Sequence, residues 1–190
     1  IYRLCREKGM AAVTITDHNV IDGALAIADL PGAFVGCEYT TYFPEDRCKV
    51  HVLVYGQSEA QHREITEARE NIYDFVEYLR DQDLPAICAH PFFWVNDRLT
   101  VDHVEKLVLL FKNWELNGDM HPAMNAAVEE LAAGLTPGLV GRLADKHGIH
   151  PHFAEPWRKN LTSGSDDHSS LNLARAYTEV PYARTLAEFW

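Results

Sequence analysis

The sequence lacks several features that would place it in other classes of protein. No apolar run is long enough to span a bilayer, and the chain opens on Ile1-Tyr2-Arg3 without a basic and then apolar leader. We therefore expect a cytoplasmic protein with no membrane partner. The four cysteines show no CxxC spacing, which favours reduced, mostly buried thiols over a disulfide framework.

Basic residues are also scarce. The chain carries 17 Lys and Arg against 28 Asp and Glu, so its formal net charge is −11. Nucleic-acid wrapping needs a basic stripe, so a nucleic-acid partner is not expected. An anionic substrate would need bound cations to invert the local potential, and the ten histidines point to metal ions in that role.

What remains is an ordinary globular composition. Hydrophobic residues make up 47% and charged residues 24% of 190 residues, enough for one domain with a real core. No internal repeat or low-complexity linker divides the chain, so we expect one domain over residues 1–190. We also expect it to be truncated at both termini, because it begins on Ile rather than Met and ends on apolar Phe189-Trp190. The sequence leaves the oligomeric state open.

Apolar, β-branched segments alternate with amphipathic segments along the chain. This alternation is typical of βα units and predicts an α/β fold with a parallel sheet. The expected strands are 11–16, 33–37, 49–55, 85–89, 113–116, 149–153, 161–165 and 174–180. The expected helices are 1–9, 21–30, 58–79, 101–111, 122–146 with an interruption at 136–137, and one from 185 onward.

Polar side chains that can bind metal recur where the predicted strands stop. The carboxyl ends of parallel strands converge on one face, so we expect these side chains to meet there. Imidazole and carboxylate ligands together suit Zn, Mn or Fe. A carboxylate can also bridge two ions, and such pairs catalyse in-line displacement at phosphorus. The strand-end residues are Asp17-His18, Glu38, His90, Glu115 with Asn117, and Asp166 with His168.

These segments resemble, in order, the motifs of the PHP (polymerase and histidinol phosphatase) family of metal-dependent phosphoesterases. The resemblance implies a distorted seven-stranded (β/α) barrel that holds two or three divalent ions. The matching motifs are Ile15-Thr16-Asp17-His18-Asn19 with Gly23, Gly36-Cys37-Glu38-Tyr39-Thr40-Thr41, His51-Val52-Leu53-Val54-Tyr55-Gly56, Ala89-His90-Pro91, Glu115-Leu116-Asn117-Gly118 and Gly164-Ser165-Asp166-Asp167-His168.

The resemblance implies six metal ligands, and we further expect two catalytic side chains. Asp17 is expected to orient a ligand or water, and His168 to act in catalysis as well as in metal binding. The family's opening motif, Asp-x-His-x-His, has no counterpart here, so we expect the first barrel strand to be missing from the sequence. The ligands are His18 and His168 for the third metal, Glu38 as the bridge, His51 and His90 for the second metal, and Asp166 for the first.

Some of these residues have other interpretations. His18 lies in an Asp-His-Asn cluster that could cap a helix, and His51 begins a strand, where a core histidine is common. Glu115 and Asn117 share one face of their strand and are as consistent with a structural role as with substrate contact. The loops 42–48, 92–100 and 153–160 are expected to select the substrate.

Three functions follow from this reading. The first is a hydrolase that uses a metal-activated hydroxide on a small phosphate ester of the nucleotide or sugar phosphate type. The second is a PHP-like binding or regulatory domain without catalysis. The third, amide hydrolysis on the related amidohydrolase barrel, is disfavoured because that family's pattern uses a lysine ligand, and no lysine ends a predicted strand.

Overall fold

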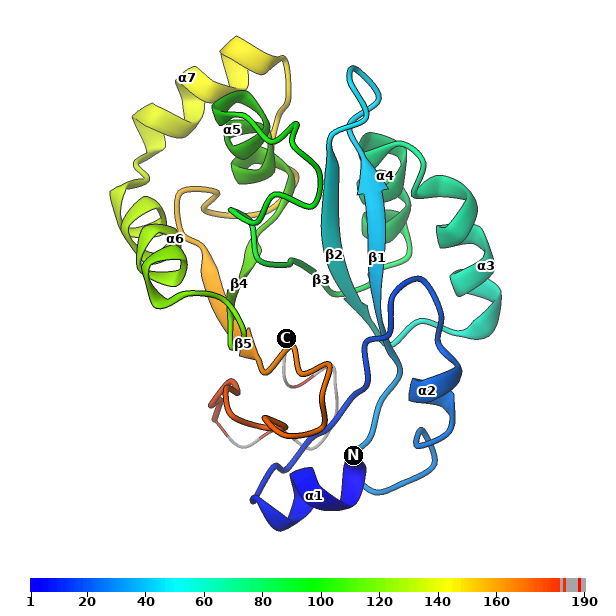
Figure 1. Cartoon of the computed structure of the whole chain (residues 1–190). Helices are drawn as coiled ribbons and strands as arrows, with labels where there is room; N and C mark the ends of the chain where they lie inside the picture. Colours follow the sequence, from blue (N-terminus) through cyan, green and yellow to red (C-terminus); the bar gives the residue numbers. More distant parts are fainter. Residues whose placement is uncertain (182, 184–187, 189–190) are drawn as a thin grey trace.

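A computed structural model describes all residues except 182, 184–187 and 189–190 (Figure 1). The described residues form an α/β fold with one open five-stranded sheet in the order β1-β2-β3-β4-β5. The strands are β1 (Gly36–Tyr42), β2 (Lys49–Tyr55), β3 (Ala86–Cys88), β4 (Asn113–Asn117) and β5 (Asn160–Gly164). The helices are α1 (Tyr2–Glu7), α2 (Asp22–Leu25), α3 (Glu59–Ala68), α4 (Ile72–Asp81), α5 (Val101–Leu110), α6 (Pro122–Gly134) and α7 (Pro137–His147).

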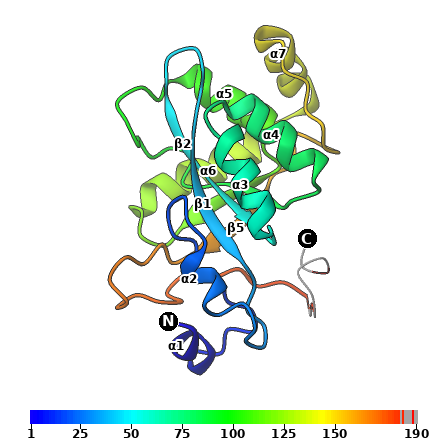
Figure 2. The same cartoon turned by 90° about the vertical axis from the view of Figure 1, so that its right-hand side faces the viewer.

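The sheet is mixed, so the prediction of a parallel sheet holds for only part of it. β3, β4 and β5 are parallel, whereas β2 runs antiparallel to both of its neighbours. β1 and β2 are joined by the tight turn 43–48, in which the Phe43 and Cys48 backbones hydrogen bond. A turn this short joins antiparallel strands, because a parallel pair needs a long crossover. Figure 2 shows the hairpin as one long twisted ribbon.

The closed seven-stranded barrel is wrong, because three predicted strands do not form within the described residues. Residues 11–16 run parallel to residues 33–38 but meet them only through the isolated bridges Val13↔Ala33 and His18↔Glu38. Residues 149–153 are irregular after the helix-ending Gly148, and residues 174–180 begin at Ala174 with a φ of 53°, which interrupts extended backbone. The sheet therefore stays open.

Most helix predictions are confirmed, with shifted ends. The exception is 58–79, which is two helices, because Asn71 adopts an extended conformation and its side chain accepts a hydrogen bond from the Tyr73 amide. The break at residues 136–137 is confirmed, with Thr136 capping α7 through the Leu139 amide. Helix 21–30 shortens to α2. The helix expected from 185 onward lies largely outside the described residues.

The main core lies between one face of the sheet and helices α3 to α7, whose buried side chains form a single cluster with those of β1 to β4. Figure 1 shows α3 and α4 beside the β1–β2 hairpin, with α5, α6 and α7 toward the other end of the sheet, near β4 and β5. Tyr39, Phe75 and Trp114 are among its largest fully buried side chains. All four cysteines are buried and unpaired, as predicted. In the part of the chain described, no helix is long and apolar enough to cross a membrane.

Candidate metal centre

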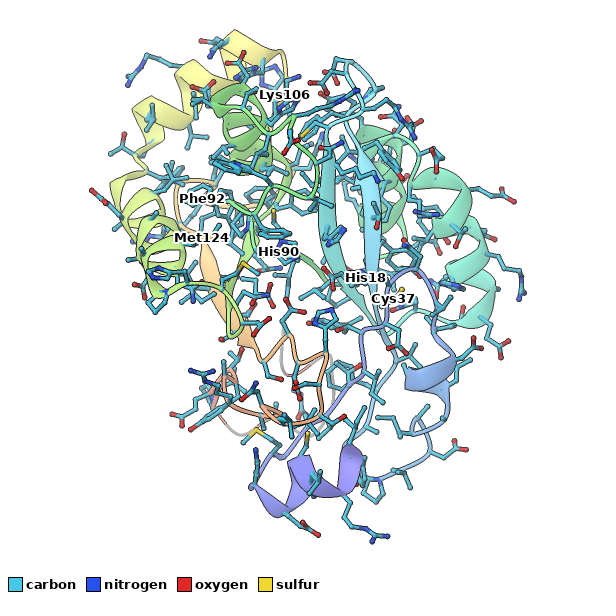
Figure 3. The ribbon with its side chains drawn as sticks, viewed as in Figure 1. His18, Cys37, His90, Phe92, Lys106 and Met124 are labelled. Carbon is cyan, nitrogen blue, oxygen red and sulfur yellow. The ribbon has the colours of Figure 1, made fainter. Side chains whose placement is uncertain are left out.

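A buried carboxylate, Glu38 on β1, is surrounded by three imidazole rings, of which His18 and His90 are labelled in Figure 3. Its Oε1 atom lies 2.8 Å from His51 Nδ1 and 3.0 Å from His90 Nε2. Its Oε2 atom lies 3.7 Å from His18 Nδ1. Four of the residues expected to bind metal therefore converge, although they come from four separate segments of the chain.

The antiparallel hairpin explains how His51 reaches Glu38. The register pairs Thr40 with His51, and Glu38 lies two residues from Thr40 on the same face of β1. Glu38 and His51 are therefore diagonal neighbours on one face of the sheet. Convergence at strand ends does not apply to this residue, because His51 lies near the start of β2.

The other two rings come from irregular backbone. His18 is bridged to Glu38 in parallel register, and the next residue, Asn19, donates its amide to the Glu38 carbonyl at 2.9 Å. His90 follows β3 with a φ of 26°, a left-handed conformation that a residue with a side chain rarely adopts. Strain of this kind gathers at functional sites, and here it turns an imidazole toward the carboxylate.

The donor atoms fit a divalent cation. His51 Nδ1 is buried and lies close to Glu38, yet the ring orientation leaves it without a hydrogen bond. One ligand atom from each of His18, Glu38 and His51 lies within 4.8 Å of the others. An ion with mixed imidazole and carboxylate ligands requires a ring nitrogen that is free of other hydrogen bonds and close to a carboxylate. The buried His51 Nδ1 beside Glu38 meets both conditions.

Electrostatics keeps Glu38 ionised. Burial alone would raise the pKa of its carboxyl, but the adjacent imidazoles of His51 and His90 outweigh burial and hold that pKa well below its usual range. Burial would likewise lower the pKa of His90, and the Glu38 carboxylate reverses that effect and raises it. Glu38 is therefore a charged acceptor at neutral pH, the form that binds a cation.

A series of hydrogen bonds through Glu115 and Asn117 links this cluster to Asp166. Glu115 Oε2 accepts hydrogen bonds from the His90 amide at 3.0 Å and from Asn117 Nδ2 at 3.1 Å. The same Asn117 nitrogen donates to Asp166 Oδ2 at 2.9 Å. Burial raises the pKa of Glu115 above its ordinary value. The sequence left the roles of Glu115 and Asn117 open, although their shared face at the end of β4 was a signal for this contact.

The remaining predicted residues lie at the rim. The His168 side chain is 67% exposed, its Nδ1 lies 3.7 Å from Asp166 Oδ1, and its ring centroid is 6.1 Å from that of His18. The Asp17 carboxylate lies against Gly23 of α2, while the Asp17 carbonyl accepts the Glu38 amide at 3.2 Å. The catalytic roles of Asp17 and His168, and the metal-ligand roles of all six expected ligands, stay predictions.

Another group of possible ligands, Asp102, Glu105 and His147, joins α5 to α7. Lys146 Nζ already lies 2.7 Å from Asp102 Oδ1 and 2.6 Å from Glu105 Oε2, and His147 Nε2 lies 2.6 Å from the same Glu105 oxygen. An ammonium group therefore occupies the position that a metal ion would take. We interpret this group as a salt-bridge network between two helices.

Asn117→Ala is expected to weaken metal binding by about 10- to 100-fold, because Asp166 loses the donor that orients it. Calorimetric titration with Mn²⁺ or Zn²⁺ measures the effect. The matched control is Asn113→Ala at the other end of β4, where the side chain bonds Ala86 and Asn160. Equal weakening by both substitutions would mean that β4, rather than the orientation of Asp166, was disturbed.

Two solved structures share this fold. A protein assigned as a metal-dependent phosphoesterase from Bifidobacterium adolescentis superposes with a TM-score of 0.58 at 14% identity, covering 93% of this chain and 85% of that one. An amidohydrolase from Chromobacterium violaceum, solved with bound sulfate and no metal, gives a TM-score of 0.54 at 15% identity, with 93% and 84% coverage. No protein-family model and no curated protein sequence matches. At these identities the likeness establishes a shared fold.

Proposed function

We propose that this protein is a metal-dependent phosphoesterase of the PHP type that hydrolyses a small phosphate ester of the nucleotide or sugar phosphate type. The observation that carries the proposal is the buried Glu38 carboxylate with three imidazoles around it, one of which has an unbonded buried nitrogen. The shared fold with a phosphoesterase is consistent with it. The buried, unpaired thiols suit the reducing cytoplasm, where we place the protein.

The chain's own residues divide the work between holding ions and handling the substrate. The proposed site takes two or three Zn, Mn or Fe ions. Glu38 with His18, His51 and His90 would hold one or two of these ions. Asp166 and His168 would complete the set of ligands. Such ions, when bound, activate water and neutralise phosphate charge. Asn117 keeps Asp166 turned inward. His168, which is exposed at the rim, is the imidazole that a substrate could reach, and Asp17 is proposed to orient a ligand or water.

Chelation provides the direct test. Protein treated with EDTA is expected to lose hydrolysis of p-nitrophenyl phosphate and to regain it when Zn²⁺, Mn²⁺ or Fe²⁺ is added. Elemental mass spectrometry should find two or three ions per chain in the active form. The hydrolysis assay also separates phosphoesterase from amidohydrolase activity, because a p-nitroanilide substrate in place of p-nitrophenyl phosphate reports amide hydrolysis. Metal binding with neither activity would favour a binding or regulatory domain.

A further inference from the structure

A continuous series of rings leads out of the metal centre to the loop that follows β3. The centroid of His18 lies 4.9 Å from that of His51, His51 lies 5.1 Å from His90, and His90 lies 5.3 Å from Phe93. Phe93 meets the His90 ring edge to face, at 81°. The first side chain beyond the proposed ligands on this side is therefore aromatic.

The loop that carries Phe93 is fixed at its base. The Phe93 amide donates to the His90 carbonyl at 2.8 Å, and the Val95 amide donates to the Phe93 carbonyl at 3.1 Å. Phe92 points the other way, with its ring 6.4 Å from that of the buried Trp114. Two consecutive tight turns and the half-buried Phe92 side chain thus determine which residues face outward.

The same loop is tied to the β1–β2 hairpin. Asn96 Oδ1 accepts the Lys49 amide at 3.1 Å, and Asn96 Nδ2 donates to the Arg47 carbonyl at 3.0 Å. The Arg98 guanidinium donates to the Asp46 carbonyl. Because the hairpin also carries Glu38, the loop and the metal centre share one rigid support.

Two large aromatic side chains are left in solvent by this arrangement. Phe93 is 42% exposed and Trp94 is 71% exposed. Residues 91–96 read Pro-Phe-Phe-Trp-Val-Asn and contain no charged group. Phe93 contacts the His90 ring of the metal centre, and Trp94 is the next residue of the same loop. Exposed aromatic rings at such a place are suited to stacking on a flat ligand ring. Stacking needs no opposite charge, so the acidity of the protein does not oppose it.

We propose that Phe93 and Trp94 form a stacking subsite for a planar ring in the leaving group of the phosphate ester, and so select nucleoside or aryl phosphates over aliphatic ones. The inference rests on the proposed function, since the phosphate must lie at the metal centre for the ring to reach these residues. Both residues belong to the loop 92–100 that the sequence marks as substrate-selecting.

The test compares four phosphate esters on the metal-loaded protein. The ring substrates are 1-naphthyl phosphate and AMP, which distinguish an aryl from a nucleobase ring, and the aliphatic ones are glycerol 2-phosphate and phosphocholine. Trp94→Ala and Phe93→Leu are expected to raise KM about 10- to 100-fold for the ring substrates, with little change in kcat and none for glycerol 2-phosphate. Trp94→Phe keeps an aromatic ring, so its KM for the ring substrates should stay close to that of the unsubstituted protein.

Val101→Ala serves as the matched control, because Val101 is an equally exposed apolar residue, at 73%, that begins α5. An equal KM change for all four esters, or no change with any, would overturn the stacking subsite. A selective effect on phosphocholine would also overturn it, because it would indicate recognition of an ammonium group.

Binding of 1-naphthyl phosphate, followed by fluorescence titration, separates this inference from the proposed function. If the protein hydrolyses no ester but binds the probe in a Trp94-dependent way, the phosphoesterase proposal fails and the subsite stands. If it hydrolyses esters without dependence on Trp94, only the subsite fails. If it neither hydrolyses nor binds, both fail.

Discussion

Glu38→Gln is expected to lower metal affinity at least about 100-fold and to abolish metal-dependent hydrolysis. The substitution keeps the shape of the side chain but removes the carboxylate charge that lies among His18, His51 and His90. The three imidazoles would then have to hold a divalent cation with Asp166 as the remaining carboxylate of the proposed ligand set. Elemental mass spectrometry and the p-nitrophenyl phosphate assay on the purified variant measure both effects.

The control for this experiment is Glu105→Gln, which makes the same change in the cluster that joins α5 to α7. Because Lys146 already neutralises that cluster, we expect full metal content and full activity. If Glu105→Gln lost metal while Glu38→Gln retained it, the metal centre would lie between α5 and α7 rather than at Glu38. That result would refute our assignment.

Trp114→Ala is expected to reduce the free energy of unfolding by about 3–5 kcal/mol, the largest effect on stability that we predict. The Trp114 side chain is 1% exposed and lies in β4 between β3 and β5. Its ring contacts that of Phe92, and Lys159 Nζ lies 5.8 Å above it. Removing the ring leaves a cavity beneath the loop that carries His90. Urea denaturation at constant pH measures the change.

Trp94→Ala is the comparison for stability, because the same residue type is deleted at a site that is 71% exposed. We expect its effect to be within about 0.5 kcal/mol. Trp114→Phe should cost less than Trp114→Ala, since it retains an aromatic ring and removes an indole nitrogen that is buried without a hydrogen bond. If Trp94→Ala were as destabilising as Trp114→Ala, the core described above would be misplaced.

Local patterns predicted the elements that depend on local sequence. The strand 49–55 and the helix 101–111 are recovered almost residue for residue, because alternation and amphipathic spacing lie within each segment. The segment 11–16 has the same apolar, β-branched character and yet remains irregular. Whether such a segment becomes a strand depends on hydrogen-bonding partners elsewhere, which its own residues do not specify.

The antiparallel hairpin was missed for a related reason. Ending the strand at Cys37 left a long gap before Lys49, which is enough for a crossover, whereas β1 continues to Tyr42 and leaves only a tight turn. The proximity of Glu38, His51 and His90 was anticipated from residue type and motif order, whereas their role as metal ligands stays a prediction. The contact between Glu38 and His51 arises from the register of β1 and β2, which one residue of slippage would destroy.

The two halves of the centre are built on supports of unequal stiffness. Glu38 and His51 belong to a ladder of seven paired residues, so their separation is set before any ion arrives. Asp166 and His168 lie in irregular backbone after β5, where Asn117 orients Asp166 and the His168 side chain is 67% exposed. Glu38 and His51 would offer an ion a preorganised pair of donors, and the exposed His168 would adjust to it. Discrimination by ionic radius would then belong to the hairpin, and a change in coordination number would be accommodated by the loop after β5.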